Sequence, residues 1–123
     1  GAELRARVLR QAAALIAPGG LFVFSVWQFQ HSPKLLARVQ PWAAAGLDEA
    51  DLEPGDTLLD GRAEAHTPAE APALRYVHRF SPEELRELAA QAGLVLRETF
   101  ESDGHGGRLG LYSVLQKPQS EEP

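Results

Sequence analysis

The chain has 123 residues, of which 44% are hydrophobic and 24% are charged, and it contains no cysteine. This length allows one domain, and the composition is that of an ordinary globular protein. No apolar run reaches the about 18 residues that a membrane span needs. The lack of cysteine excludes disulfides and thiolate metal sites and fits a cytoplasmic protein. The formal net charge of −5 argues against a self-sufficient nucleic-acid binder, because such proteins usually carry a basic face.

The N-terminal residues 3–17 predict an amphipathic helix, because apolar residues recur there at helical spacing while arginines take the other side. Pro18-Gly19-Gly20 ends the helix, since proline cannot continue its hydrogen bonds and glycine permits a reversal. Residues 21–27, LFVFSVW, follow as a short run of aromatic and β-branched residues. This run is typical of a strand buried on both faces, usually in a parallel sheet.

Residues 28–73 have a different composition, rich in proline, glycine and acidic side chains. Short helices are expected at 32–39 and 48–52, and the polar stretch 62–73 is expected to be mobile. A connection this long inside a compact domain is usually a functional lid or an insertion.

Residues 81–93, SPEELRELAAQAG, predict the next helix. Ser81 is the expected N-cap, Pro82 takes the first helical position, and Glu84 completes a capping box with Ser81. Gly93 is the expected C-terminal cap.

Two strands, at 94–101 and 108–117, are expected to form an antiparallel hairpin around the turn DGHGG at 103–107. The tail from Pro118 is expected to be disordered. The order of helix, strand, insertion, helix and hairpin is an α/β pattern. If the crossover is right-handed, both helices tend to cover one face of the sheet. We therefore expect more protein, in this chain or a partner chain, to complete the sheet.

The same segments carry a family resemblance. VLRQAAALIAPGGLFVFSVW resembles the segment from the fourth helix to the fifth strand of class I S-adenosylmethionine-dependent methyltransferases. FSPEELRELAAQAGLVL resembles their last helix and sixth strand, and RLGLYSVLQK resembles the seventh strand, which inserts antiparallel between the fifth and sixth. The resemblance implies the C-terminal half of a Rossmann-like methyltransferase sheet, with residues 1–117 in one domain and 28–73 a substrate-side insertion.

A narrower resemblance concerns the methyltransferases that esterify carboxymethyl groups on wobble uridines of tRNA. SVWQFQ, PGDTLLDG and RYVHRFSPEEL resemble, in order, segments of their C-terminal half. Asp60 and Gly61 stand where that family has proline and tryptophan, and Val77 replaces a tyrosine. The resemblance implies methyl transfer to a carboxylate of a modified tRNA, and it makes Asp56 a candidate substrate-binding residue, whereas its local sequence indicates a turn former.

The family's cofactor half carries a glycine-rich turn after its first strand and an acidic residue after its second. As in dinucleotide-binding sites, the turn lets the backbone approach the ligand, and the carboxylate binds the ribose hydroxyls. No such unit occurs in this sequence, since the turn at 103–107 does not precede a helix. We therefore expect S-adenosylmethionine to be bound mainly by the absent N-terminal half, and this chain alone to be inactive.

Ligands of open α/β sheets bind at the carboxyl ends of the parallel strands. Trp27, Gln28, the insertion and His105 are expected to share that rim, and Arg75 and His78 end the insertion near it. Trp27 is either the last core residue of its strand or a pocket wall. His105 is expected to be an exposed turn residue or a ligand-binding one.

Three residues of the segment RYVHRF are candidate substrate ligands. Arg75 can hold a carboxylate or phosphate with two parallel hydrogen bonds, although arginines are normally exposed. His78 and Tyr76 share a face if the segment is extended, with Arg75 and Arg79 opposite. His78 is a pocket residue or a packing residue at the helix entry, and Tyr76 stacks on a base or packs in the core.

The four histidines lack zinc-ligand spacing, so no metal site is expected. The favoured function is part of an S-adenosylmethionine-dependent methyltransferase acting on tRNA. Two alternatives stay open: a small-molecule methyltransferase of the same fold, and a non-catalytic module that pairs with another chain.

Overall fold

The computed structural model describes residues 1–61 and 73–119. It divides into two compact units, which we call the main unit (Gly1–Gln28 with the chain from Phe80 onward) and the inserted unit (Phe29–Arg79). The mobile stretch expected at 62–73 and the tail expected from Pro118 fall almost entirely outside the described residues. Within those residues, no helix combines the length and apolar character needed to cross a membrane.

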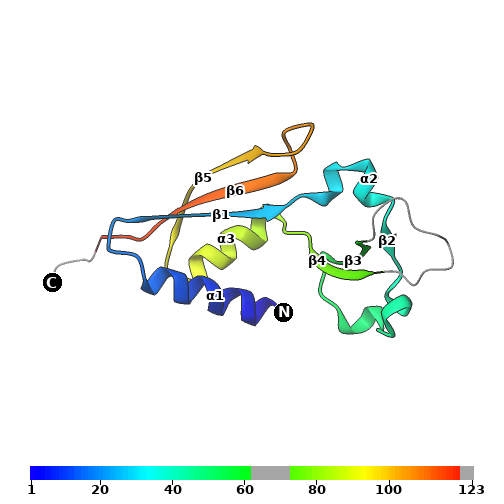
Figure 1. The fold of residues 1–123 in the computed structure, drawn as a ribbon. Coiled ribbons are helices and arrows are strands. Elements are labelled where there is room, and N and C mark those ends of the chain that lie inside the picture. The colour runs from blue at the N-terminus through cyan, green and yellow to red at the C-terminus, as the bar shows by residue number, and fades with distance from the viewer. Residues whose placement is uncertain (62–72, 120–123) are drawn as a thin grey trace. The chain divides into compact units, whose positions relative to one another are not determined.

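The main unit contains two helices and a three-stranded sheet (Figure 1). Its elements are α1 (Ala2–Ala14), β1 (Leu21–Trp27), α3 (Pro82–Gln91), β5 (Val95–Ser102) and β6 (Gly110–Gln116). β6 lies between β1 and β5 and pairs antiparallel with both, so β1 and β5 run parallel to each other. This order confirms the prediction that the last strand inserts antiparallel between the two preceding strands.

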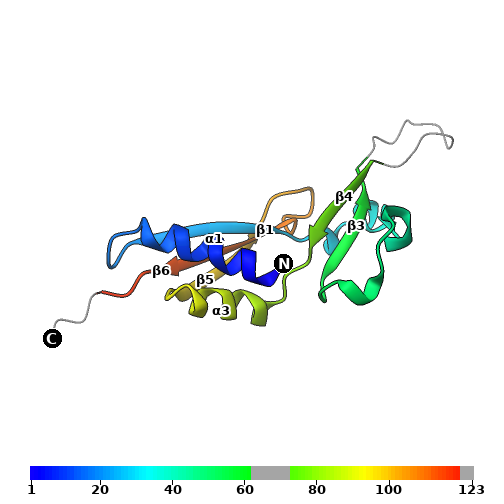
Figure 2. The ribbon, with the colours of Figure 1, turned by 90° about the horizontal axis from the view of Figure 1, so that it is seen from below.

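Both helices lie against one face of this sheet (Figures 1 and 2). Leu9 of α1, Leu88 of α3 and Leu115 of β6 form the centre of the core, and Leu115 is only 1% exposed. Phe22 and Phe24 point from β1 into the same cluster and stack at 5.8 Å between ring centroids. Alternate apolar residues of β1 therefore hold the helices on the sheet.

The other face of β1 is open in the described chain. Leu21 is 61% exposed and Val23 is 52% exposed. Within the described residues, β1 is therefore buried on one face only, whereas the sequence predicted burial on both. Nor does any described strand pair with the outer edge of β1. The expectation that further protein completes the sheet stays a prediction.

The ends of α3 are fixed as the sequence predicts, whereas α1 ends at Ala14, three residues before the predicted end at residue 17. The Ser81 hydroxyl accepts a hydrogen bond from the Glu84 backbone N–H at 3.1 Å, and Gly93 after α3 has φ +72°. At the end of α1, the Lys117 ammonium donates to the Ala13 and Ile16 carbonyl oxygens, each at 2.9 Å. Lys117, the residue that follows β6, thereby caps the first helix.

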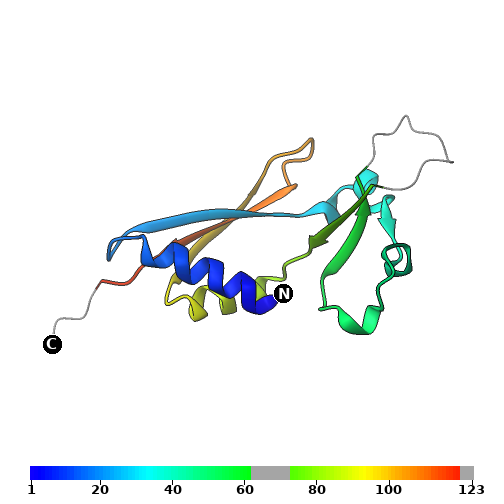
Figure 3. The same ribbon diagram turned by 60° about the horizontal axis from the view of Figure 1, so that its bottom comes forward.

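The inserted unit has a small sheet of its own, with β3 between β2 and β4 and all pairs antiparallel (Figure 3). Its elements are η1 (Phe29–His31), α2 (Pro33–Leu36), β2 (Val39–Gln40), η2 (Trp42–Ala45), η3 (Glu49–Asp51), β3 (Asp56–Asp60) and β4 (Leu74–His78). The helices expected at 32–39 and 48–52 are present but shorter. β3 was not predicted from the sequence, and β4 was predicted only as a segment that could be extended.

Candidate functional site

Gly55 sets the pairing of β3 with β4. Its φ of +96° lies in the region that favours glycine. A Cβ at this position would overlap the Arg79 carbonyl oxygen and lie 3.1 Å from Cε1 of His78. The Arg79 backbone N–H donates to the Gly55 carbonyl at 2.8 Å, and the register places Asp56 opposite His78. The two strand ends are therefore held close together by backbone contacts.

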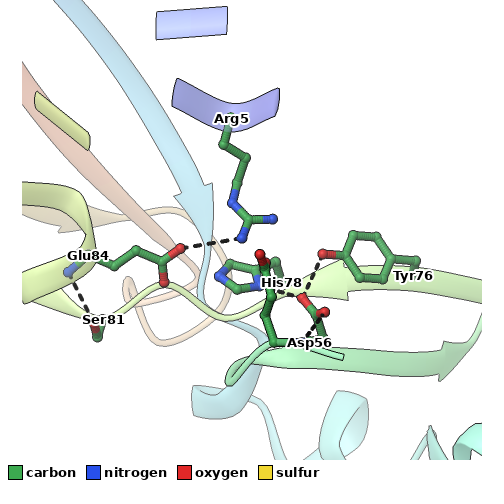
Figure 4. Close-up of polar contacts among 7 residues, drawn as sticks. Arg5, Asp56, Tyr76, His78, Ser81 and Glu84 are labelled. Atoms are coloured by element: carbon green, nitrogen blue, oxygen red, sulfur yellow. Dashed lines mark hydrogen bonds and ion pairs between the residues drawn. The ribbon is translucent and has the colours of Figure 1, made fainter. Parts of the chain in front are cut away.

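Asp56, Tyr76 and His78 form a polar cluster at these strand ends (Figure 4). Oδ1 of Asp56 accepts a hydrogen bond from the Tyr76 hydroxyl at 2.7 Å, and Nδ1 of His78 lies 2.7 Å from the same oxygen. Oδ2 accepts from the Glu53 backbone N–H at 2.9 Å. The side chains of His78 and Asp56 are only 5% and 7% exposed. The structure thus joins three residues that the sequence proposed separately.

The Asp56 carboxylate is ionised in this setting. Burial alone would raise its pKa, but the hydrogen bonds from Tyr76, from the Glu53 backbone and from His78 together outweigh it and lower the pKa. An ionised carboxylate has no proton to donate, so Nδ1 of His78 must carry the hydrogen in the bond between them. In the neutral ring the lone pair then lies on Nε2.

Glu53, Asp56 and His78 also offer one ligand atom each, all within 4.8 Å of one another. The spacing of the histidines in the sequence gave no sign of this group, because its members come from a turn and two strands. Nδ1 of His78 already donates to Asp56 at 2.7 Å, so it is not available to bind a cation while that bond is kept. Hydrogen bonding between these groups is therefore enough to explain why they lie close together.

Arg75 does not join the cluster. It is exposed and stands opposite Leu59 in the β3–β4 register. Because Tyr76 and His78 both reach Asp56, strand alternation directs Arg75 to the other side of β4. The prediction that Tyr76 and His78 share a face is confirmed.

The main unit has a rim where β1 and β5 both end. The register aligns Trp27 with Gly110 and Gly110 with Ser102, so the turn at 103–107 lies at the same end of the sheet as Trp27. Gln28 is buried there, and its Nε2 donates to a Glu101 carboxylate oxygen at 2.8 Å and to the Arg108 carbonyl at 2.9 Å. The prediction that Trp27, Gln28 and the turn carrying His105 share this rim is confirmed, and the place of the insertion at the rim stays a prediction.

His105 is exposed at the tip of this turn, as expected. The expectation that Arg75 and His78 reach the rim stays a prediction.

Trp27 also lines an apolar groove of about 430 Å³ in the main unit. Leu4 and Val8 of α1 form one wall, and Phe80 lies at the entry to α3. The Arg5 guanidinium lies 5.6 Å from the centroid of the Phe80 ring and 3.7 Å from the Glu84 carboxylate, as Figure 4 shows for the ion pair. Trp27 is therefore a groove wall at the end of its strand.

The described residues do not fit an S-adenosylmethionine site by themselves. Such a site needs a glycine-rich turn from a strand into a helix, so that the backbone can approach the ligand. The glycine-rich turn at 103–107 instead joins the two strands β5 and β6, and α3 begins after Phe80 and Ser81.

Comparisons with known proteins place the fold. No protein-family profile and no curated protein matches the chain. Among solved structures, the chain is similar to a SAM-dependent methyltransferase from Methanosarcina mazei, with a TM-score of 0.62 and 17% sequence identity. The match covers 98% of this chain and 54% of that one, so the chain spans about half the length of the structure it matches. The likeness establishes a mixed α/β fold similar to that of a methyltransferase.

Proposed function

We propose that this chain forms the substrate-side half of an S-adenosylmethionine-dependent methyltransferase. The observation that carries the proposal is the sheet order β1-β6-β5, in a chain of which 98% matches a SAM-dependent methyltransferase structure. Both units contribute to that match, since 98% coverage leaves neither out. Fold likeness alone does not define a reaction, so the proposal depends on the site as well.

The cofactor is bound mainly by further protein, either the remaining half of the domain or a partner chain that completes the sheet. The outer edge of β1 is available for strand pairing, and Leu21 and Val23 expose the face that a completed α/β sheet would cover. The apolar groove beside Trp27 opens along the same strand. These features suit protein contacts that exclude water.

The first acceptor class is the one that the sequence resemblance implies, a carboxymethyl group on a wobble uridine of tRNA. Its support is that the two resembling segments, PGDTLLDG and RYVHRF, pair with each other as β3 and β4. Arg75 would hold the acceptor carboxylate with two hydrogen bonds. Because the chain has a net charge of −5, most phosphate contacts would come from the completing protein.

The second acceptor class is a small molecule with a hydroxyl or amine group. The bond between Asp56 and His78 favours it, because a proton-accepting imidazole is useful only when the acceptor must lose a proton. A carboxylate is already charged at neutral pH, and its methylation requires placement and exclusion of water rather than a base.

The experiment uses the complete protein encoded with this chain and S-adenosylmethionine carrying a labelled methyl group. Transfer is measured to tRNA with carboxymethyluridine and to a panel of small phenols, alcohols and amines. If tRNA is the acceptor, Arg75→Ala lowers the rate at least tenfold, since a paired, charged contact is lost. Arg79→Ala is the matched control and leaves the rate within about twofold.

Transfer to none of these acceptors would reject the methyltransferase proposal and favour a module that acts only by pairing. An unchanged rate of Arg75→Ala on tRNA would remove Arg75 from the site.

A further inference from the structure

We propose that a cavity of the main unit, lined by α3 and β5, binds a small organic acid. The ligand class is a single carboxylate on an apolar body that also carries a hydroxyl or N–H donor. The cavity has a volume of about 320 Å³, which lies within the usual range for small-molecule sites, about 300–1,000 Å³. All of its lining residues belong to the main unit. The site concerns binding alone, so it stands or fails independently of the proposed methyl transfer.

Gln28 supplies a hydrogen-bond acceptor to this cavity. Its Nε2 donates to the Glu101 carboxylate at 2.8 Å and to the Arg108 carbonyl at 2.9 Å. Because both partners are acceptors, they fix which end of the amide is the nitrogen and leave Oε1 as the other end. Gln28 is only 8% exposed and lines the cavity, yet Oε1 has no partner among the described residues and solvent still reaches it. A ligand O–H or N–H can therefore donate to this oxygen.

A β-bulge in β5 shapes the wall that faces α3. Leu96 pairs with Leu115 of β6. Glu98 pairs with Val114, the neighbour of Leu115, so Arg97 is an extra residue without a partner on β6. A bulge bends its strand and redirects side chains. Arg97 and Glu98 both line the cavity, whereas strict alternation would direct them to opposite faces of the sheet.

The charged part of the lining consists of Arg86, Arg97 and Glu98. Arg86 is exposed and makes no hydrogen bond or ion pair with a described residue. Nε of Arg97 donates to Oε1 of Gln116 at 2.8 Å, and its two terminal nitrogens bond to no residue that the structure describes. Two arginines and one glutamate leave one net positive charge, which favours a singly charged anion. A guanidinium holds a carboxylate with two parallel hydrogen bonds, while a doubly charged phosphate would also be repelled by Glu98.

The remaining lining is mainly apolar. Leu85 of α3 is only 2% exposed, and Leu96 of β5 and Leu111 of β6 lie in the same wall. Contact with these side chains removes apolar ligand surface from water, and this contributes to binding in proportion to the area buried. An acid with a hydrocarbon body therefore fits the cavity better than an inorganic anion does.

A structural role explains only part of the Gln28 amide. The two bonds from Nε2 hold Glu101 and the Arg108 backbone on either side of the turn at 103–107. That role needs no acceptor oxygen open to a cavity. The inference depends on the combination of this open acceptor, two guanidinium groups and an apolar wall in one cavity.

The direct test is a titration of the 123-residue chain with para-hydroxybenzoate at pH 7, followed by nitrogen-15 NMR. This probe has the carboxylate, the apolar ring and the hydroxyl donor. We expect saturable binding with a Kd below about 1 mM and shifts of the Leu96, Thr99 and Leu111 amides and of the Gln28 side-chain amide. No saturable shift at about ten times that concentration, or shifts confined to the groove beside Leu4 and Val8, would overturn the inference.

Three further probes separate the contacts. Benzoate lacks the hydroxyl and should bind at least about fivefold more weakly than para-hydroxybenzoate, because Oε1 of Gln28 loses its donor. Para-hydroxybenzamide lacks the charge and should bind at least about tenfold more weakly. Phenyl phosphate should bind more weakly than benzoate. Equal affinity for either of the first two, or tighter binding of the phosphate, would contradict the proposed ligand class.

Variants assign the contacts to residues. Arg86→Gln and Arg97→Gln should each weaken para-hydroxybenzoate binding at least about fivefold. Arg10→Gln, at an exposed arginine of α1 outside this cavity, removes the same charge and should change the Kd less than about twofold. An equal loss in Arg10→Gln would show general charge attraction and overturn the site.

Gln28→Leu tests the acceptor oxygen. In this variant para-hydroxybenzoate should lose its advantage over benzoate, because the oxygen that accepts from the hydroxyl is gone. A preference that survives Gln28→Leu would contradict the role of Gln28. If the variant does not fold, the comparison of the two probes in the unaltered chain decides: a preference for para-hydroxybenzoate supports the inference, and equal affinity overturns it.

Discussion

The main unit and the inserted unit use their buried interiors differently. The main unit buries aliphatic and aromatic side chains such as Leu88 and Leu115 beneath its two helices. The inserted unit buries an aspartate and a histidine that bind each other at 2.7 Å. Burial of apolar area stabilises a fold, whereas burial of ionisable groups costs free energy unless they are paired. The inserted unit also buries apolar residues such as Leu58 and Leu59, so what distinguishes its interior is the paired carboxylate and imidazole.

Each unit contains one tryptophan, which allows them to be followed separately. Trp27 ends β1 in the main unit, and Trp42 begins η2 in the inserted unit. Chains with Trp42→Phe report unfolding of the main unit by fluorescence, and chains with Trp27→Phe report the inserted unit.

The largest effect is expected in the main core. Leu115→Ala should lower the free energy of unfolding of the main unit by about 2–5 kcal/mol, because it leaves a cavity between the sheet and both helices. Leu21→Ala, at a residue 61% exposed, is the matched control and should change it by less than about 0.5 kcal/mol. Denaturant titration of Trp27 fluorescence measures both. Equal losses would contradict the assignment of the two faces of the sheet.

The next effect concerns the turn that joins the strands of the polar cluster. Gly55→Ala should destabilise the inserted unit by more than about 2 kcal/mol, because it combines positive-φ strain with overlap of the Arg79 carbonyl. Gly46→Ala shares the positive φ, but its added Cβ meets nothing within 4 Å, and about 1 kcal/mol is expected. Trp42 fluorescence measures the pair. A Gly46 loss as large as that of Gly55 would show that the close approach is unimportant.

Loss of a helix cap should have a smaller effect, and a similar one in each unit. Ser81→Ala removes the hydroxyl that accepts from the Glu84 N–H at 3.1 Å and should cost the main unit about 1 kcal/mol. Ser32→Ala removes the equivalent bond to the Leu35 N–H at 3.2 Å in the inserted unit. Each variant should shift the transition of its own unit. A shift of both transitions by both variants would show that the units unfold together.

The smallest effect is a pH dependence confined to the inserted unit. The pKa of Asp56 is lowered in the folded chain, so its stabilising contribution is complete above the unfolded pKa of about 4 and is lost as the pH falls through the lower folded pKa. Asp56→Asn should weaken the pH dependence of the stability of the inserted unit, measured by Trp42 fluorescence. The pH dependence of the main unit, measured by Trp27 fluorescence, should not change. An unchanged acid profile in Asp56→Asn would mean that the carboxylate is not held as described.

Local sequence signals predicted the main unit well. The run LFVFSVW coincides with β1 (Leu21–Trp27), and Ser81 caps α3 as its capping pattern requires. These features depend on residues near one another in the chain, where periodicity and capping chemistry act directly. The position of β6 between β1 and β5 came from family resemblance rather than from local pattern.

The inserted unit was predicted less well, for a physical reason. Asp56 and His78 are 22 residues apart, and their contact depends on the β3–β4 register, which no local pattern specifies. Alternation along β4 did predict that Arg75 and His78 would lie on different faces of that strand. The role of Gly55 could have been suspected from the Pro-Gly-Asp turn, but the approach of Arg79 could not.

The most direct test of the account is calorimetry of the 123-residue chain with S-adenosylmethionine, compared with the complete protein. We predict no measurable heat of binding to the chain at millimolar ligand and micromolar binding to the complete protein, because the described residues hold no glycine-rich turn from a strand into a helix. Micromolar binding to the chain alone would contradict it.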